Sequence, residues 1–81
     1  MATDSPAERV VTEIRAAMAR RRVSQEVLAR ALRISQAAVS RRLNGTVDFT
    51  VTEIHTIAEV LQVDAAELLT PASARGMRSA S

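Results

Sequence analysis

Residues 36–41, QAAVSR, combine side chains that can hydrogen-bond to the edges of nucleic-acid bases. The amide of Gln36 can form two hydrogen bonds with adenine, and the guanidinium of Arg41 can do the same with guanine. The methyl group of Ala37 can contact a thymine methyl, and Ser40 is small enough to let a helix enter a groove. This chemistry requires that all four side chains share one face of a helix.

A helix that begins after a Ser35 cap meets this requirement. Val39 and Leu43, one turn apart, would then be buried, while the opposite face would expose Ala37, Ser40, Arg41 and Asn44, flanked by Gln36 and Arg42. That face carries no acidic residue that would repel phosphate. The alternative is the solvated polar face that most amphipathic helices possess. The missing acid and a second short helix just before this one favour DNA.

No glycine or proline marks a boundary between these two helices, because residues 24–44 contain neither. Wound as one helix, the stretch would place Ser35 and Arg42 near the middle of its apolar arc. Burying an unpaired arginine there is strongly unfavourable. A break at residues 33–34 removes the conflict and yields two short helices. The first of them then turns four apolar residues inward: Val27, Leu28, Ala31 and Leu32.

Helix-start signals recur along the chain and predict an all-α fold of five helices, at about 6–21, 24–32, 35–44, 50–62 and 64–70. Three sites read as capping boxes and two as simple serine caps. In chain order, the capping residues are Ser5 with Glu8, Ser24, Ser35, Thr50 with Glu53, and Asp64 with Glu67.

Apolar residues at helical spacing predict the core of this bundle. Phe49, the one aromatic residue, is expected to anchor the core rather than to stack on a base. The other predicted core residues outside 24–45 are Val10, Ile14, Ala17, Met18, Ile54, Ile57, Ala58, Leu61, Leu68 and Leu69.

Length and composition place the chain among small globular domains. It has 81 residues, no cysteine and a net charge of +2, and all 11 of its basic residues are arginines. No apolar run approaches the length of a membrane span, and the acidic start does not resemble a signal peptide. We expect a flexible arm at 1–5, one domain at 6–70 and a disordered basic tail at 71–81. A cytoplasmic location, close to the nucleoid of a bacterial host, fits these features.

The residues discussed so far resemble the Cro/phage-repressor type, also called lambda-repressor-like, of helix-turn-helix domain. The similarity covers about residues 7–70 and implies a five-helix bundle, with its helix-turn-helix at about 24–44, that binds operator DNA, usually as a dimer on paired half-sites. The matching positions are Gln25, Glu26, Ala29, Leu32, Ile34, Ser35, Gln36, Val39, Ser40, Leu43, Asn44, Gly45, Phe49, Ile54, Ile57, Ala58, Leu61, Val63, Leu68 and Leu69.

The resemblance also implies roles for single residues. Gln36, Ala37 and Arg41 match positions that face base edges, and Ala29 matches a position packed where two helices cross. Glycine is common in the turn, where this chain has Arg33, so the turn either strains a left-handed arginine or takes another shape. Four positions match phosphate contacts: Gln25, Ser35, Asn44 and Thr46. Neighbouring residues extend this phosphate-binding set by Ser24, Arg42, Thr50 and Arg22.

These features predict a sequence-specific transcriptional regulator, a phage or prophage repressor or a bacterial relative, bound to a double-stranded operator. Two copies would pair either in solution or only on DNA. The rival interpretation is a protein-interaction module, such as an antitoxin or adaptor, built on the same fold. No cofactor or metal is expected, because His55 is the one histidine and no cysteine accompanies it. No catalytic motif supports an enzyme.

Overall fold

The computed structural model describes residues 5–69, which form five α-helices and no strand. The predicted tail at 71–81 and residues 1–4 of the predicted arm lie outside these described residues. The helices are α1 (Pro6–Arg21), α2 (Gln25–Leu32), α3 (Gln36–Leu43), α4 (Val51–Leu61) and α5 (Ala65–Leu69). Connections of three residues join α1 to α2, α2 to α3 and α4 to α5, whereas residues 44–50 form a longer one. The predicted break between two short helices is confirmed.

Side-chain caps begin the first four helices where the sequence predicts them. Ser5 and Glu8 form a complete capping box at α1, and Thr50 and Glu53 form another at α4. The Ser24 and Ser35 hydroxyls accept hydrogen bonds from the amides three residues later. Each cap satisfies a backbone donor that has no partner inside its helix. At α5, the amide of Glu67 donates to the Asp64 carbonyl oxygen at 2.9 Å.

The ends of α1, α2 and α4 share one conformation that usually requires glycine. Arg22, Arg33 and Gln62 all adopt left-handed backbone angles, with φ of 57°, 59° and 59°. At each end the following amide bonds to a carbonyl five residues back, which is the Schellman pattern. Arg33 is therefore a left-handed turn residue. At the end of α3 the left-handed position falls on Gly45, with φ of 88°.

Apolar residues follow each of these three left-handed positions and cover the core from its edge. Val23, Ile34 and Val63 are partly buried and pack against the central cluster. Such a contact commonly accompanies the Schellman pattern, and here it offsets part of the backbone strain. The tight connections are therefore held by burial as well as by hydrogen bonds.

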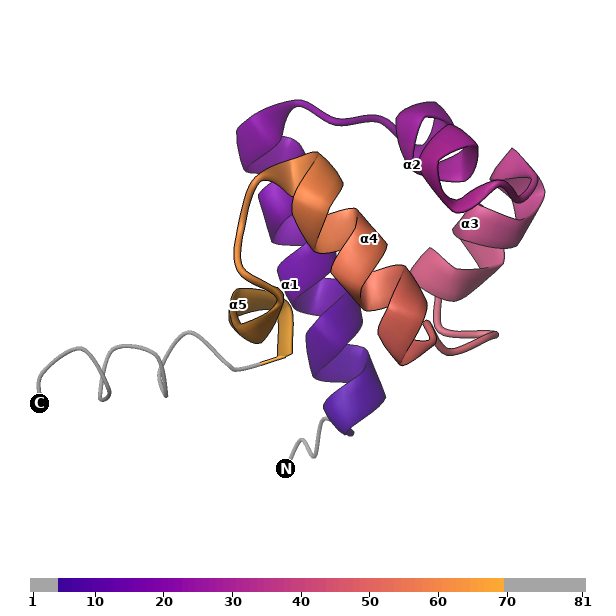
Figure 1. Cartoon of the computed structure of the whole chain (residues 1–81). Coiled ribbons are helices and arrows are strands. Elements are labelled where there is room, and N and C mark those ends of the chain that lie inside the picture. The colour runs from indigo at the N-terminus through magenta and orange to yellow at the C-terminus, as the bar shows by residue number, and fades with distance from the viewer. Residues whose placement is uncertain (1–4, 70–81) are drawn as a thin grey trace, which may run out of the picture.

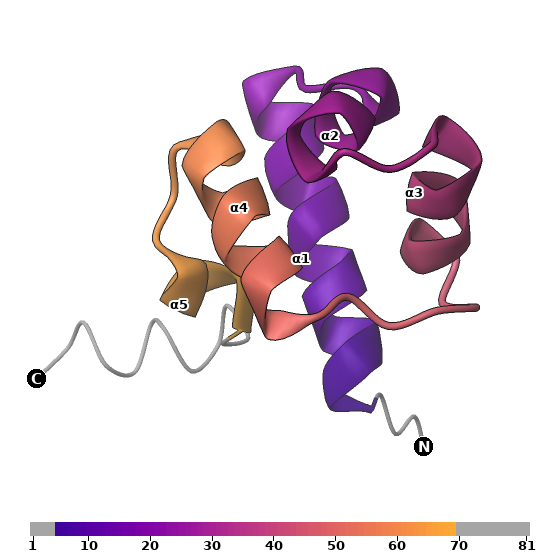
Figure 2. The same cartoon turned by 45° about the vertical axis from the view of Figure 1, so that its right-hand side comes forward.

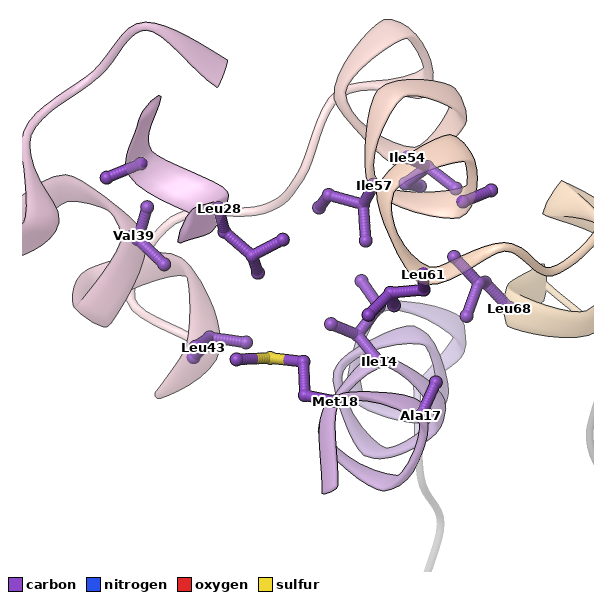
Figure 3. Close-up of a cluster of buried hydrophobic side chains, with 12 residues drawn as sticks. Ile14, Ala17, Met18, Leu28, Val39, Leu43, Ile54, Ile57, Leu61 and Leu68 are labelled. Carbon is purple, nitrogen blue, oxygen red and sulfur yellow. The ribbon is translucent and has the colours of Figure 1, made fainter. Parts of the chain in front are cut away.

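The core lies between α1 and α4 and receives side chains from all five helices (Figure 3). Met18 extends toward Leu43 and so joins α1 to α3 (Figure 3). Two expected core residues are exposed, Val27 by 41% and Leu69 by 49%. Each adjoins a fully buried leucine in a short helix, and adjacent helical positions point about 100° apart. Phe49 is half-buried against the core, as expected.

The third helix stands at the edge of the bundle. In both Figure 1 and Figure 2, α3 lies on the side opposite α5, with α1 and α4 between them. It packs mainly against α2 and also touches α1. This placement leaves one side of α3 uncovered. Among residues 5–69, no helix is both long and apolar enough to span a membrane.

Candidate nucleic-acid interface

The exposed face of α3 has the composition that the sequence predicts. Val39 and Leu43 are buried, with 0% and 2% of their surfaces exposed. The residues Ala37, Ser40, Arg41, Asn44 and the flanking Gln36 are exposed, whereas Arg42, expected at the other flank, is half-buried. Residues 36–43 include no acid. The outer face consists of Gln36, Ala37, Ser40, Arg41 and Asn44. We name these five residues the α3 face.

The turn before α3 sets how the two short helices meet. Arg33 reverses the chain in its left-handed conformation, and its amide bonds to the Arg30 carbonyl at 3.2 Å. The amide of Ile34 bonds to the Ala29 carbonyl at 3.1 Å, and Ala29 is buried. The Ser35 hydroxyl then caps α3 by accepting from the Ala38 amide at 3.0 Å. The α3 face therefore begins directly after a turn fixed by three hydrogen bonds.

Three predicted phosphate-binding hydroxyls are helix caps, and this use leaves them able to donate. Ser24, Ser35 and Thr50 each accept a hydrogen bond from a backbone amide. A hydroxyl has one donor proton in addition to its acceptor lone pairs. Each cap can therefore accept from its own helix while donating to an anion. All three residues are exposed.

Asn44 and Thr46 bond to each other just after α3. The Asn44 Oδ1 atom accepts from the Thr46 amide at 3.0 Å and from the Thr46 hydroxyl at 2.6 Å. The single hydroxyl proton of Thr46 is thus already used, whereas the Asn44 side-chain nitrogen still offers two donors. Of the two, Asn44 is the better placed to donate to a phosphate.

Two further predicted phosphate contacts, Gln25 and Arg22, lie around the start of α2. Gln25 is the first residue of α2 and is half-buried. Arg22 is exposed at the left-handed end of α1, two residues before the α2 cap. Both lie beside the amino end of α2, where backbone amides and the helix dipole favour an anion.

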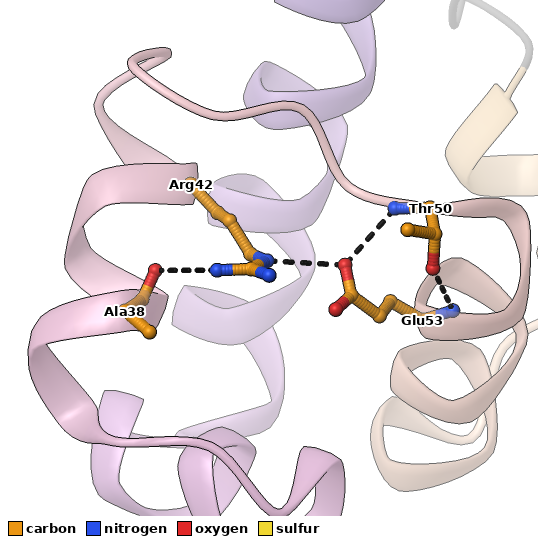
Figure 4. Close-up of polar contacts among 4 residues, drawn as sticks. All are labelled: Ala38, Arg42, Thr50 and Glu53. Carbon is orange, nitrogen blue, oxygen red and sulfur yellow. Dashed lines mark hydrogen bonds and ion pairs between the residues drawn. The ribbon is translucent and has the colours of Figure 1, made fainter.

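Arg42, predicted to contact phosphate, is engaged inside the molecule. Its Nε atom donates to Glu53 Oε1 at 3.1 Å, and its Nη1 atom donates to the Ala38 carbonyl at 3.1 Å (Figure 4). The side chains of the ion pair are both only 17% exposed. Arg42 thus links α3 to the first turn of α4. Spacing within α3 alone gives no signal for this partner, because Glu53 lies 11 residues further along the chain on another helix.

Glu53 is the centre of a small polar network. The Thr50 amide donates to the same Oε1 atom at 2.9 Å, and the Thr50 hydroxyl accepts from the Glu53 amide at 3.0 Å (Figure 4). Burial raises the pKa of the Glu53 carboxyl. The hydrogen bonds from the Thr50 amide and from Arg42, with the positive charge of Arg42, outweigh burial and bring that pKa below its ordinary value. The carboxylate is therefore charged when it holds Arg42.

Sequence reasoning missed a second arginine that holds α3. Nε and Nη2 of Arg15, on α1, donate to the carbonyl oxygen of Leu43 at 3.2 and 3.0 Å. Similarly, Nη2 of Arg21 donates to the Gln62 carbonyl at the end of α4, at 3.3 Å. Both arginines join residues far apart in the chain, and helical spacing carries no signal for such pairs.

Fold and site together define a helix-turn-helix domain that displays a polar, acid-free second helix. The family model of the Cro/C1-type HTH DNA-binding domain matches residues 13–72. Because this match covers most of the chain, the protein belongs to the Cro/C1-type helix-turn-helix family. The expected family and all-helical fold are confirmed. Searches of curated proteins and of solved structures found no match.

Proposed function

We propose that this DNA-binding domain belongs to a sequence-specific transcriptional regulator that occupies a double-stranded operator with α3 in the major groove. The observation that carries the proposal is the α3 face, whose five residues are all exposed and include no acid, while Val39 and Leu43 on the other side of the helix are buried. A major groove about 12 Å wide admits a helix with such a face. The regulator is a phage or prophage repressor, or a bacterial relative that represses by occupancy.

Within this proposal, the α3 face supplies the sequence information. Gln36 pairs with adenine and Arg41 with guanine, each through two hydrogen bonds. Ala37 and Ser40 allow the close approach of the helix, and Ala37 contacts a thymine methyl. One good two-bond contact discriminates against a wrong base by about 1–3 kcal/mol.

The phosphate contacts surround this face. Ser24 and Gln25 start α2, Ser35 starts α3, and Thr50 starts α4, so three helix amino ends contribute. Arg22 and Asn44 complete the set, whereas Thr46, whose amide and hydroxyl both donate to Asn44, orders the loop and makes no phosphate contact. We assign Arg42 to holding α3 against α4 instead, because its guanidinium already binds Glu53 and Ala38. Such contacts fix the position of the protein on the duplex, whereas base contacts specify the site.

The test is a selection of duplexes from a random library with the wild-type protein, followed by footprinting of variants. The double substitution Gln36→Ala with Arg41→Ala is expected to abolish the footprint on the selected site. The matched control Glu26→Gln with Arg30→Gln changes an exposed pair on α2, side chains 64% and 76% exposed, and should leave the footprint intact. An unchanged footprint with the α3 variant would refute groove reading and favour the protein-interaction module.

The selection also tests whether two copies act together. We propose that the regulator binds as a homodimer on paired half-sites, formed in solution or only on DNA. Selected sites with two-fold symmetry, with half-sites about 10 base pairs apart or a multiple of this, would support pairing. A single short asymmetric site would contradict it.

A further inference from the structure

The carbonyl groups at the end of α3 are all bonded, but one of them by a distant side chain. The last four carbonyl groups of a helix have no hydrogen-bond donor within the helix and need partners from outside it. Amides of residues 44–46 bond to the carbonyls of residues 40–42. The remaining carbonyl, that of Leu43, receives two hydrogen bonds from Arg15 on α1. Arg15 thus caps the carboxyl end of α3 from outside.

This contact is suited to orienting a helix. Two nitrogens of one rigid guanidinium converge on a single oxygen, so both the distance and the direction of the bond are defined. The positive charge lies at the negative end of the α3 dipole. Arg15 also follows the fully buried Ile14 on the longest helix, so its backbone is firmly held.

We propose that Arg15 is a positioning residue that sets the tilt of α3 and thereby the sequence specificity of the domain. The inference rests on the proposed function and assigns Arg15 no contact with DNA. An eight-residue helix is about 12 Å long, so movement at one end displaces the α3 face along its whole length. Hydrogen bonds to base edges tolerate only a few tenths of an ångström. Water can satisfy the Leu43 carbonyl if Arg15 is lost, but water does not fix the direction of the helix.

The experiment compares Arg15→Gln and Arg15→Lys with wild type on two duplexes: the site selected by the wild-type protein and a scrambled duplex of equal composition. Affinities are measured across a salt series, at a temperature where circular dichroism shows each variant folded. For Arg15→Gln we expect about a tenfold loss on the selected site, comparable with one mismatched base pair. Affinity for the scrambled duplex and the salt slope should stay unchanged.

Arg15→Lys keeps the charge and one donor but not the rigid fork, so it should recover part of the lost specificity. The control Arg30→Gln removes the same charge from the exposed pair on α2 and should leave the specificity ratio unchanged. If Arg15→Gln fails to fold, the same criteria apply to Arg15→Lys.

Other outcomes overturn the proposal in distinguishable ways. An equal loss on both duplexes, with a salt slope shallower by about 1, would make Arg15 a phosphate contact. A lower melting temperature with an unchanged specificity ratio would make its role purely structural. If the wild-type protein itself prefers no sequence, the proposed function fails before the Arg15 variants are compared.

Discussion

Arg42 Nε lies 3.1 Å from Glu53 Oε1, and this ion pair fastens the last turn of α3 to the first turn of α4. The same carboxylate oxygen completes the capping box of α4 through the Thr50 amide. The Glu53 side chain therefore caps the amino end of α4 and also anchors α3. With Arg15 at its carboxyl end, α3 is fixed to both α1 and α4, so two arginines of the region support the α3 face and do not form part of it.

The Arg42–Glu53 pair should contribute more to stability than an exposed pair with the same separation. Arg30 and Glu26 are also 3.1 Å apart, but their side chains are 76% and 64% exposed, against 17% for both members of the first pair. A double-mutant cycle with Arg42→Met and Glu53→Gln should give a coupling energy of about 1 kcal/mol. The cycle with Arg30→Met and Glu26→Gln should give about 0.3–0.5 kcal/mol. Equal couplings in urea unfolding would contradict the role of burial.

The lowered pKa of Glu53 predicts how stability depends on pH. Because the carboxyl binds its proton less tightly in the folded state, the unfolded state takes up more protons in acid. The stabilisation is complete above the unfolded pKa, about 4.3, and is lost as pH falls through the lower folded value. The melting-temperature difference between wild type and Glu53→Gln should therefore shrink between neutral pH and about pH 3. A difference that is constant over this range would exclude the effect.

Replacing the left-handed arginine in the turn by glycine should stabilise the domain. Arg33→Gly removes backbone strain of about 1–2 kcal/mol, and the greater freedom of glycine in the unfolded chain cancels part of it. We expect a net gain of about 0.5–1 kcal/mol, or a few degrees in melting temperature. Arg22→Gly and Gln62→Gly should behave alike in thermal unfolding.

Two controls sharpen this prediction. Arg30→Gly, inside α2, should destabilise by about 1 kcal/mol, because there the helical conformation favours a side chain. Gly45→Ala should also destabilise, although an added methyl group meets nothing within 4 Å, because φ there is 88°. A stabilised Gly45→Ala variant would show that backbone strain does not determine how substitutions at these helix ends affect stability.

The salt dependence of operator binding should distinguish an arginine that contacts phosphate from one that holds α3 in place. The logarithm of affinity should fall with that of salt concentration with a slope of about −0.9 for each phosphate that an arginine neutralises, and Arg22 is the cation of the proposed phosphate set. Arg22→Gln should make this slope shallower by about 1. Arg42→Met should leave it unchanged, because its guanidinium faces Glu53. Filter binding from low to moderate salt measures the slopes, and binding independent of salt would refute the proposed interface.

The sequence predicted what depends on near neighbours along the chain. Serine and threonine caps act over three residues, and helical burial repeats over three or four, so both the helix boundaries and the α3 face could be read directly. The bonds that hold α3 join Arg15 to Leu43 and Arg42 to Glu53, across 28 and 11 residues. No local pattern specifies such partners. Val27 and Leu69 were wrongly placed in the core because apolar character alone does not decide which of two adjacent positions a short helix buries.

The lengths of the connections between helices also determine where this domain can accept inserted residues. Three of the four connections have three residues each and begin with a left-handed residue followed by an apolar residue packed on the core. An insertion there would break both the left-handed turn and this apolar contact. Residues 44–50 form the one longer connection of the described chain, and Thr46 and Val47 within it are exposed. Lengthening a surface loop has only a small entropic cost. Under the proposed function, new operator preferences would therefore arise by insertion beside the α3 face, while the bundle that supports it stays the same.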